Sequence, residues 1–493
     1  MNIADHLPAL QIVLPLMGAV LTALVRRGGP AWVISFVVSW AMPFIAFALL
    51  LKVQATGPIS YALGGWQPPM GIEYRVDIVN AYLLVLVSVM AALVITYAPR
   101  SIAAEIDEGK RGWTYTMYLL CLTGLLGILI TGDAFNVFVF LEVSSLSTYV
   151  LIAMGRDKRA LVSAYQYLIV GTIGATFYVI GVGLLLVMTG TLNLMDIAER
   201  LPQVEQTRSV VAALAFITVG IGLKLALFPL HSWLPNAYAY APSAVTAFLA
   251  STATKVAVYL LLRYFFTVFG AAYVFSQAPT TPVLLVLSVA AMFGASIVAV
   301  FQSDVKRLLA YSSVAQIGYI TLGIALANHT GLTGGIVHLF NHALIKGALF
   351  LAIGCVVFRV GGVKIDDLAG IGRKMPWTMA AFVIAGLGLI GVPGTAGFVS
   401  KWYLVAGALE NGWWWLAFLI VISSLIAVIY VGRLVEIAWF REPSKAVAEG
   451  RPPPAEMIAV TWVLTAATVY FGLDADLTAG IASQAANTLL GGY

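Results

Sequence analysis

The feature that most limits what this chain can fold into is a succession of apolar segments between residues 7 and 473. Each is about 20 residues long, which is the length of helix that crosses the hydrocarbon core of a bilayer. Only 10% of the 493 residues are charged, whereas soluble domains carry about 25%. Strand-type alternation is absent. The sequence therefore predicts an all-α polytopic membrane protein.

We place about 14 transmembrane helices along the chain. They cover residues 7–25, 31–51, 77–98, 113–131, 134–154, 161–189, 209–232, 243–262, 282–301, 308–327, 332–358, 377–400 (running on toward 409), 414–440 and 456–473.

Given these spans, successive loops are alternately rich and poor in basic residues. One set of loops holds 17 of them: Arg26, Arg27, Arg100, Lys110, Arg111, Arg156, Lys158, Arg159, Lys306, Arg307, Arg359, Lys364, Arg373, Lys374, Arg441, Lys445 and Arg451. The opposite loops hold five: Lys52, Arg75, Arg200, Arg208 and Arg263. Lys and Arg favour cytoplasmic loops, so both termini are expected on the non-cytoplasmic side. The net charge of +5 then reflects this bias, and no nucleic-acid partner is expected.

A small set of polar residues cannot be assigned to loops. Its members are the cations Lys224, Lys255, Lys346, Lys401 and Arg433, the carboxylate Glu142, and the histidines His231, His338 and His342. Charges at membrane depth are costly, and they mark ion or proton paths by default. Arg433 and Glu436 are interpreted as an interfacial ion pair or as lipid-facing side chains that extend to the interface. Lys306 and Arg307 are also expected at the interface, at the start of the tenth span.

Two spans contain residues that break a helix close to a buried lysine. Pro229 follows Lys224 in "GLKLALFPLHSW", and proline removes a backbone donor. The second break lies in "GLGLIGVPGTAGFVSKW", where Gly391, Pro393 and Gly394 precede Lys401. Discontinuous helices are a recurring device of ion sites in transporters.

The two broken spans are the seventh and the twelfth. Because they lie five positions apart in the order of spans, an odd number, equivalent elements run in opposite directions, as in an inverted repeat. We therefore predict four units: residues 1–110 (helices 1–3), 111–268 (the first repeat, helices 4–8), 280–440 (the second repeat, helices 9–13) and 455–493 (helix 14).

Three groups of residues have the chemistry of a proton relay. Glu142 is interpreted as the partner of a lysine on a neighbouring span, with a fixed salt bridge between helices as the alternative. Lys255 lies in a run rich in small and hydroxylated residues. His338, His342 and Lys346 recur every four residues on one helical face; a metal site or hydrogen-bonded core histidines are the alternatives. Cys121 and Cys355 are too far apart in sequence to suggest a cluster, so neither a metal nor a cofactor is expected.

The same stretches carry a family resemblance. "GLKLALFPLHSWLPNAYAYAPSAVTAFLASTATKVAVYLL", "SDVKRLLAYSSVAQIGYI", "HLFNHALIKGALF" and "GVPGTAGFVSKW" resemble the antiporter-like subunits of Mrp-type multisubunit Na+/H+ antiporters and of respiratory complex I, with the D subunits of Mrp antiporters the most similar. The resemblance implies 14 helices with two inverted five-helix repeats and discontinuous helices 7 and 12. It also implies relay roles for Glu142, Lys224, Lys255, His338, His342, Lys346 and Lys401.

We therefore expect a proton-translocating subunit of an Mrp-type cation/proton antiporter in a prokaryotic plasma membrane, acting as a transporter subunit and not as an enzyme. Its expected partners are other subunits of the complex, protons, Na+ and lipids. Two alternatives stay open: a proton-pumping subunit of complex I or of a membrane-bound hydrogenase, and a structural scaffold.

Overall fold

A computed structural model describes residues 3–491 of the chain. Its first half contains α1 (Leu7–Val25), α2 (Gly28–Thr56), β1 (Ile59–Ala62), β2 (Glu73–Val76), α3 (Ile78–Glu105), α4 (Glu108–Ile130), α5 (Ala134–Ala153), α6 (Lys158–Thr189), α7 (Leu194–Arg200), α8 (Arg208–Leu225), α9 (Leu234–Tyr240), α10 (Ser243–Leu262) and the π-helical turn η4 (Arg263–Val268). Its second half contains α11 (Thr280–Val300), α12 (Val305–Ala325), α13 (His329–Val360), α14 (Ile371–Lys374), α15 (Pro376–Ile390), α16 (Ala396–Glu410), α17 (Trp414–Phe440), α18 (Lys445–Glu449), α19 (Ala455–Leu473) and α20 (Asp476–Leu490).

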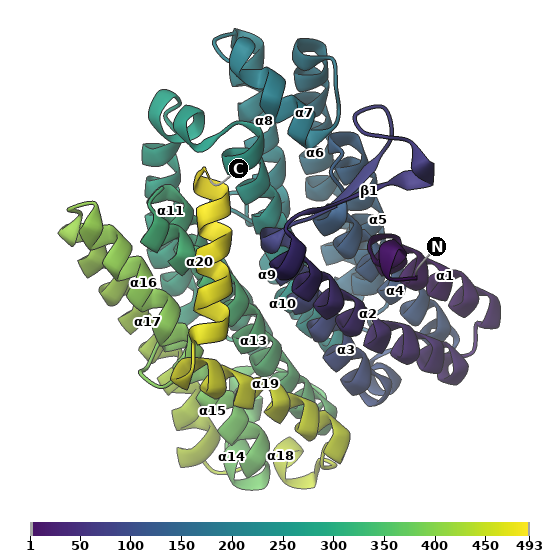
Figure 1. The fold of residues 1–493 in the computed structure, drawn as a ribbon. Helices are drawn as coiled ribbons and strands as arrows, with labels where there is room; N and C mark the ends of the chain where they lie inside the picture. The colour runs from purple at the N-terminus through teal and green to yellow at the C-terminus, as the bar shows by residue number, and fades with distance from the viewer. Residues whose placement is uncertain (1–2, 492–493) are drawn as a thin grey trace.

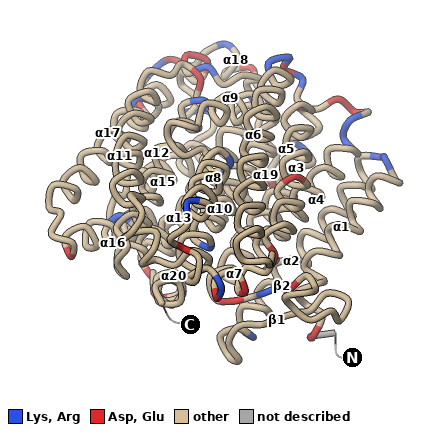
Figure 2. Tube along the Cα trace, turned by 90° about the horizontal axis from the view of Figure 1, so that it is seen from above, with Lys and Arg blue, Asp and Glu red and all other residues tan. Residues whose placement is uncertain are grey.

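The predicted all-α polytopic architecture is confirmed, and Figure 1 shows long helices packed side by side. Among the described residues, 13 helices are long and apolar enough to cross a membrane. The remaining crossing, the twelfth in chain order, consists of α15 and α16, which are interrupted at residues 391–395. In Figure 2 the charged residues gather along two opposite edges of the molecule, near α18 and near β1 and β2, and few lie in the band between them.

The last crossing, α19, is followed by a separate helix, α20. Phe471 of α19 lies edge-on to Phe340 of α13, with 5.3 Å between ring centroids. The carbonyl oxygen of Ser483 on α20 lies 3.3 Å from Nε2 of His329 at the start of α13. The pair α19 and α20 therefore runs antiparallel to α13 along its length. The predicted span 456–473 is confirmed, since α19 covers Ala455–Leu473. The separate helix α20 after it was not predicted, because the segment that follows Leu473 is more polar.

Each five-helix repeat contains a similar β-bridge between two of its loops, and the two bridges lie on opposite faces of the molecule. In the first repeat the backbone of Asp133 forms a β-bridge with Asn193. In the second, Asp304 forms the same bridge with Lys364. Each aspartate also accepts the amide of the residue three positions later, at 2.7 and 2.9 Å respectively. The shared device supports the predicted pair of inverted repeats.

The molecule departs from the all-helical expectation in one place. Strands β1 and β2 pair antiparallel in the connection between α2 and α3, with Ile59 opposite Val76. This hairpin is only four residues long on each side, too short for its alternation to stand out in the sequence. It lies on the same face as residues 3–6, since His6 contacts Tyr61 with 2.9 Å between Nδ1 and the hydroxyl.

The interior of the molecule is made by α10, α12 and α13, whose side chains are almost all buried. Small and hydroxylated residues dominate the first half of α10, and such residues allow helices to approach closely. Outer helices such as α2 instead expose apolar side chains, including Val37 and Phe44. Four of the lysines at membrane depth lie buried in the protein interior: Lys224, Lys255, Lys346 and Lys401.

Candidate functional site

Lys224 lies in the last turn of α8 and points toward α5. Its ammonium is 3.8 Å from Oε1 of Glu142 and donates a 2.6 Å hydrogen bond to Oγ of Ser145. The lysine side chain is 6% exposed and the carboxylate 27% exposed. The predicted partnership between Lys224 and Glu142 therefore appears in the structure, with Ser145 as a third member that the sequence did not single out.

The break after Lys224 follows the predicted pattern. Helix α8 ends at Leu225, and Ala226 takes a left-handed backbone conformation with φ of 59°. The chain then turns through Pro229 before α9 begins at Leu234. The indole of Trp233 donates to the carbonyl of Leu223 at 2.9 Å, so part of the backbone freed by the break is satisfied by a side chain.

A small cavity of about 30 Å³ adjoins Lys224. Its polar lining includes Ser144, Ser145 and Thr148 of α5, and its far wall is formed by Ala253, Val256 and Ala257 of α10. A space of this size holds a water molecule where polar partners are present. The cavity therefore extends from the lysine of the first repeat to the helix that carries Lys255.

Lys255 and Lys346 are both buried on the central helices. The Lys255 ammonium donates to the carbonyl of Ala250 and contacts Oγ1 of Thr254 at 3.4 Å. The Lys346 ammonium donates to Oγ of Ser312 and, at 2.9 Å, to the carbonyl of Leu309. Neutral oxygen atoms hold both lysines, and within residues 3–491 neither has a carboxylate inside 4 Å.

His338 and His342 lie one turn apart on α13 with parallel rings, 6.2 Å between centroids. The Nε2 of His338 is 2.9 Å from the amide oxygen of Gln316, and its Nδ1 is 2.8 Å from Oγ of Ser400. An amide oxygen only accepts, which assigns the proton to Nε2. Both ring nitrogens of His342 are buried and lack a partner among the described protein atoms. That arrangement suits a water molecule that His342 could bind.

Lys401 lies beyond the second break, on α16, and reaches back across it. Its ammonium donates to the last carbonyls of α15, Leu389 at 3.1 Å and Ile390 at 2.9 Å, and to Oγ of Ser424 at 2.9 Å. It also lies 4.6 Å from the ring centroid of Tyr319.

The break itself contains the predicted residues. Gly391 and Gly394 both have positive φ, at 89° and 84°, on either side of Pro393. These conformations favour glycine, because a Cβ is disfavoured there. The interruption of helix 12 is confirmed, and it presents carbonyls to Lys401.

The seven predicted residues form two groups. Glu142 and Lys224 make a pair in the first repeat. Lys255, His338, His342, Lys346 and Lys401 form a central cluster, and electrostatic interactions join Lys255 to both histidines and to Lys346 and join Lys401 to His338. The small cavity beside Lys224 lies between the two groups.

Two cations that the sequence assigned to loops are buried instead. Arg263 is 6% exposed and its Nη1 lies 2.8 Å from Oδ2 of Asp77. Lys306, expected at the interface, is 4% exposed and pairs with Glu105 at 3.8 Å. Both occur at the ends of spans, where hydropathy cannot tell a buried pair from a solvated loop. The one sequence signal for these two buried ion pairs is that an acidic and a basic residue occur at the ends of different spans on the same side of the membrane.

The expected pair of Arg433 with Glu436 is also wrong. Arg433 donates to the carbonyls of Val300 and Gln302, at 2.9 and 3.3 Å. Glu436 pairs with Arg441, 3.3 Å away. The end of α11 is close enough to take the arginine, which spacing along α17 alone cannot reveal.

Comparison with known proteins identifies the family. Residues 131–427 match the model described as "NADH:quinone oxidoreductase/Mrp antiporter, TM". The chain belongs to this family. The matched segment runs from just before α5 to the middle of α17 and contains all seven predicted relay residues.

Individual relatives cover almost the whole chain. The NADH-quinone oxidoreductase subunit N of Desulforudis audaxviator is 42% identical over 95% of this chain and 96% of its own length. The D subunit of the Na(+)/H(+) antiporter of Alkalihalophilus pseudofirmus is 28% identical over 99% and 97%. A chain in the structure of the Mrp complex from Dietzia sp. DQ12-45-1b is 26% identical, with a TM-score of 0.90 over 99% of this chain and 98% of that one.

These similarities identify the protein as an antiporter-like, multi-pass membrane subunit. The predicted all-α fold with discontinuous helices 7 and 12 is confirmed, and so is the expected membership of the family shared by Mrp antiporters and complex I.

Proposed function

We propose that this protein translocates protons across a membrane along Glu142, Lys224, Lys255, His338, His342, Lys346 and Lys401. One observation carries the proposal: buried lysine and histidine side chains occur at both broken helices and on the central helices between them. A helical scaffold alone does not require so many charges at membrane depth, since each is costly to insert.

The pair of Lys224 and Glu142 provides a way to load and release a proton. A carboxylate near an ammonium favours its charged form, whereas burial favours the neutral amine. When Glu142 is neutralised or moves away, Lys224 becomes a better proton donor to water in the adjoining cavity. Protons then pass between neighbouring sites by coupled titration, each charge altering the affinity of the next.

The assembly in which this happens has two candidates. An Mrp-type antiporter that exchanges protons for Na+ is supported by the close fold match with the Mrp complex chain. A redox-driven complex, in which electron transfer in partner subunits moves the protons, is supported by the 42% identity to an NADH-quinone oxidoreductase subunit N. In both cases the chain acts with other membrane subunits and uses no cofactor of its own.

We place the protein in the plasma membrane of a prokaryote with both termini on the non-cytoplasmic side. The supporting observations are the excess of basic residues on the opposite loops and the even number of crossings.

The test uses the native complex in inverted membrane vesicles. Lys224→Ala should abolish formation of a proton gradient, measured with a pH-sensitive dye, while native gel electrophoresis shows the complex intact. The matched control is Lys52→Ala, since Lys52 is an exposed lysine that pairs with Asp5 at 3.9 Å. Normal proton transport in the Lys224 variant would overturn the relay.

The same vesicles separate the two assemblies. If a Na+ gradient alone drives proton movement, the antiporter candidate is supported. If proton movement requires an electron donor and acceptor, the redox candidate is supported.

A further inference from the structure

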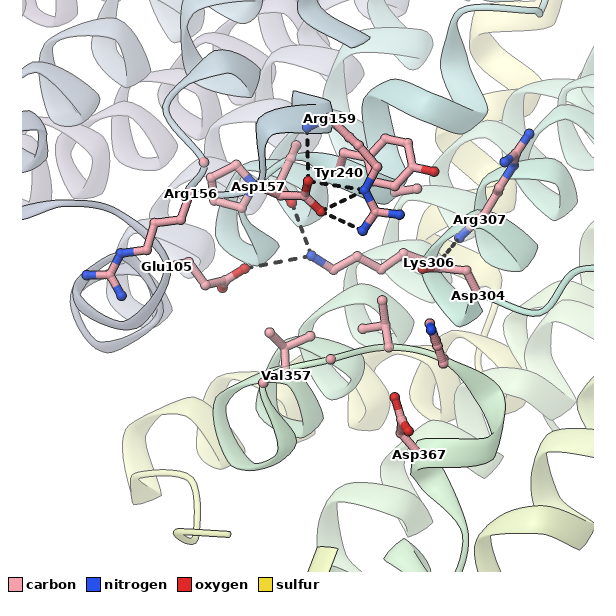
Figure 3. A pocket seen from close by; sticks show the side chains of 18 of the residues that line it. Glu105, Arg156, Asp157, Arg159, Tyr240, Asp304, Lys306, Arg307, Val357 and Asp367 are labelled. Atoms are coloured by element: carbon pink, nitrogen blue, oxygen red, sulfur yellow. Dashed lines mark hydrogen bonds and ion pairs between the residues drawn. The ribbon is translucent and has the colours of Figure 1, made fainter. Parts of the chain in front are cut away.

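A cavity of about 640 Å³ opens at the seam between the two repeats, away from the relay residues (Figure 3). The first repeat contributes the start of α6 and the corner between α9 and α10. The second repeat contributes the start of α12 and the end of α13. This cavity, which we call the seam vestibule, lies on the face that carries most of the basic loops.

Two charged side chains close the inner end of the seam vestibule. The ammonium of Lys306 lies 3.8 Å from Oε2 of Glu105 and donates to the carbonyl of Ala241 at 3.1 Å. Lys306 is 4% exposed, whereas Glu105 is 18% exposed. The carboxylate therefore meets the water of the vestibule, and the ammonium lies behind it.

Glu105 is also held by the first turn of α10. Its Oε2 accepts the backbone amide of Ser243 at 2.9 Å and the hydroxyl of Ser243 at 3.0 Å. The same carboxylate thus contacts helix α10, which carries Lys255, and helix α12 through Lys306.

Helix α12 connects the vestibule to the central cluster. Lys306 is at its vestibule end, and the residues that hold Lys346, namely Leu309 and Ser312, follow within two turns. Six residues of helix correspond to a rise of about 9 Å. A chain of a few water molecules would span such a separation. The hydroxyl of Thr246 donates to the same Ala241 carbonyl that accepts from Lys306, at 3.3 Å.

We propose that Glu105 and Lys306 form a proton-exchange site through which the solution on the basic face reaches Lys346. Glu105 takes a proton from vestibule water, the Lys306 ammonium gives its proton inward through water, and the neutral Lys306 amine then takes the proton from Glu105. This inference rests on the proposed function. The other charged and titratable groups facing the pair from the vestibule are Arg156, Asp157, Arg159, Tyr240, Asp304, Arg307, Lys364 and Asp367.

The first experiment replaces the carboxylate and keeps its hydrogen bonds. The amide oxygen in Glu105→Gln can still accept the bonds from Ser243, but it cannot carry the proton. In the native complex in vesicles we expect the proton flux to fall about tenfold, equivalent to about 1.4 kcal/mol in the barrier. The matched control is Glu456→Gln, because Glu456 lies outside the vestibule and pairs with Arg100 at 3.0 Å.

A second experiment blocks the vestibule without touching the pair. Ser303 lines the vestibule and is exposed, so Ser303→Cys presents a thiol to a membrane-impermeant, cationic methanethiosulfonate reagent. Proton flux should fall after labelling from the face of the basic loops. Ala448→Cys on α18 is the control, since it is exposed and is not part of the vestibule lining.

The outcomes separate this inference from the relay itself. If Lys224→Ala abolishes transport while Glu105→Gln and fully labelled Ser303→Cys proteins transport normally, the seam vestibule is not the entrance and the relay stands. If Lys224→Ala transports protons normally, the proposed relay is overturned, and the exchange site that rests on it is overturned as well. Loss in Glu105→Gln with a stable, assembled complex, together with block of the labelled Ser303→Cys protein, supports the exchange site.

Discussion

The two broken helices hold their lysines in different ways. Lys224 precedes its break and faces a carboxylate, Glu142, together with the hydroxyl of Ser145. Lys401 follows its break and bonds two carbonyls of the preceding half-helix, with Ser424 as its hydroxyl partner. In the part of the chain that the structure describes, no carboxylate lies within 4 Å of Lys401.

The difference separates a site that can be switched from a site that is held constant. The charge of Glu142 disappears when it is protonated, so the environment of Lys224 can change during transport. The carbonyls at the end of α15 are fixed dipoles, and the C-terminal end of a helix favours a cation at all times. The first repeat therefore holds its lysine beside a group that can lose its charge, and the second repeat holds its lysine with groups that cannot.

The sharpest test of this comparison is Glu142→Gln. If the carboxylate is the switch, proton transport should fall by about 10²-fold, within the range that a positioned proton-transfer group contributes. The measurement is the initial rate of dye quenching in vesicles, normalised to the amount of assembled complex. A rate within twofold of the native complex would mean that both lysines are held passively and that the comparison is wrong.

The hydroxyl partners offer a matched pair of smaller changes. A hydrogen bond to a charged group is worth about 1.5–3 kcal/mol, so Ser145→Ala should slow transport by about tenfold. Ser424→Ala should slow it by less than about threefold, because the carbonyls of Leu389 and Ile390 still hold Lys401. Equal losses in the two variants would show that the carbonyls do not hold Lys401 in place.

The backbones at the two breaks also differ, and stability measurements can use that difference. Gly391 has φ of 89°, and a Cβ there would lie 2.9 Å from Cδ of Lys401. Gly391→Ala should therefore lower the free energy of unfolding by about 1–2 kcal/mol, the usual cost of a left-handed alanine.

The corresponding control lies in the first break. Ala226 already has a left-handed conformation with φ of 59°. Ala226→Gly therefore removes the steric cost of that conformation in the folded protein, but it raises the conformational entropy of the unfolded chain. The net change should be below about 1 kcal/mol. Thermal unfolding of the purified complex in detergent measures both variants. A destabilised Ala226→Gly protein with an unaffected Gly391→Ala protein would reverse the predicted order.

Much of the architecture follows from local sequence. Apolar segments of membrane length predict 13 of the crossings closely, and Pro229, Gly391 and Gly394 predict the interruptions through their backbone preferences. The separate helix α20 was not predicted, because it is shorter and less apolar than a span. The short β-hairpin was missed because four-residue strands carry too little pattern.

The site could be predicted in part. Seven titratable residues could be identified from the sequence because a charge at membrane depth is costly to insert. That cost does not depend on which helices are neighbours. Arg263, Lys306 and Arg433 were misjudged because a charge at a span end is equally compatible with water, lipid headgroups or a buried partner. Asp77, Glu105 and the carbonyl of Val300 decide those three cases, and each partner comes from a distant segment of the chain.

Local sequence is enough to predict which residues must be shielded from lipid and where the helices must break, since both depend on the chemistry of single residues and their immediate neighbours. The contacts of each charge depend instead on how the helices pack. The tertiary structure places Glu142 beside Lys224, carbonyls around Lys401, and Glu105 beside Lys306 at the inner end of the seam vestibule. Contact between helices depends on their packing angles and depths, which only the assembled fold fixes.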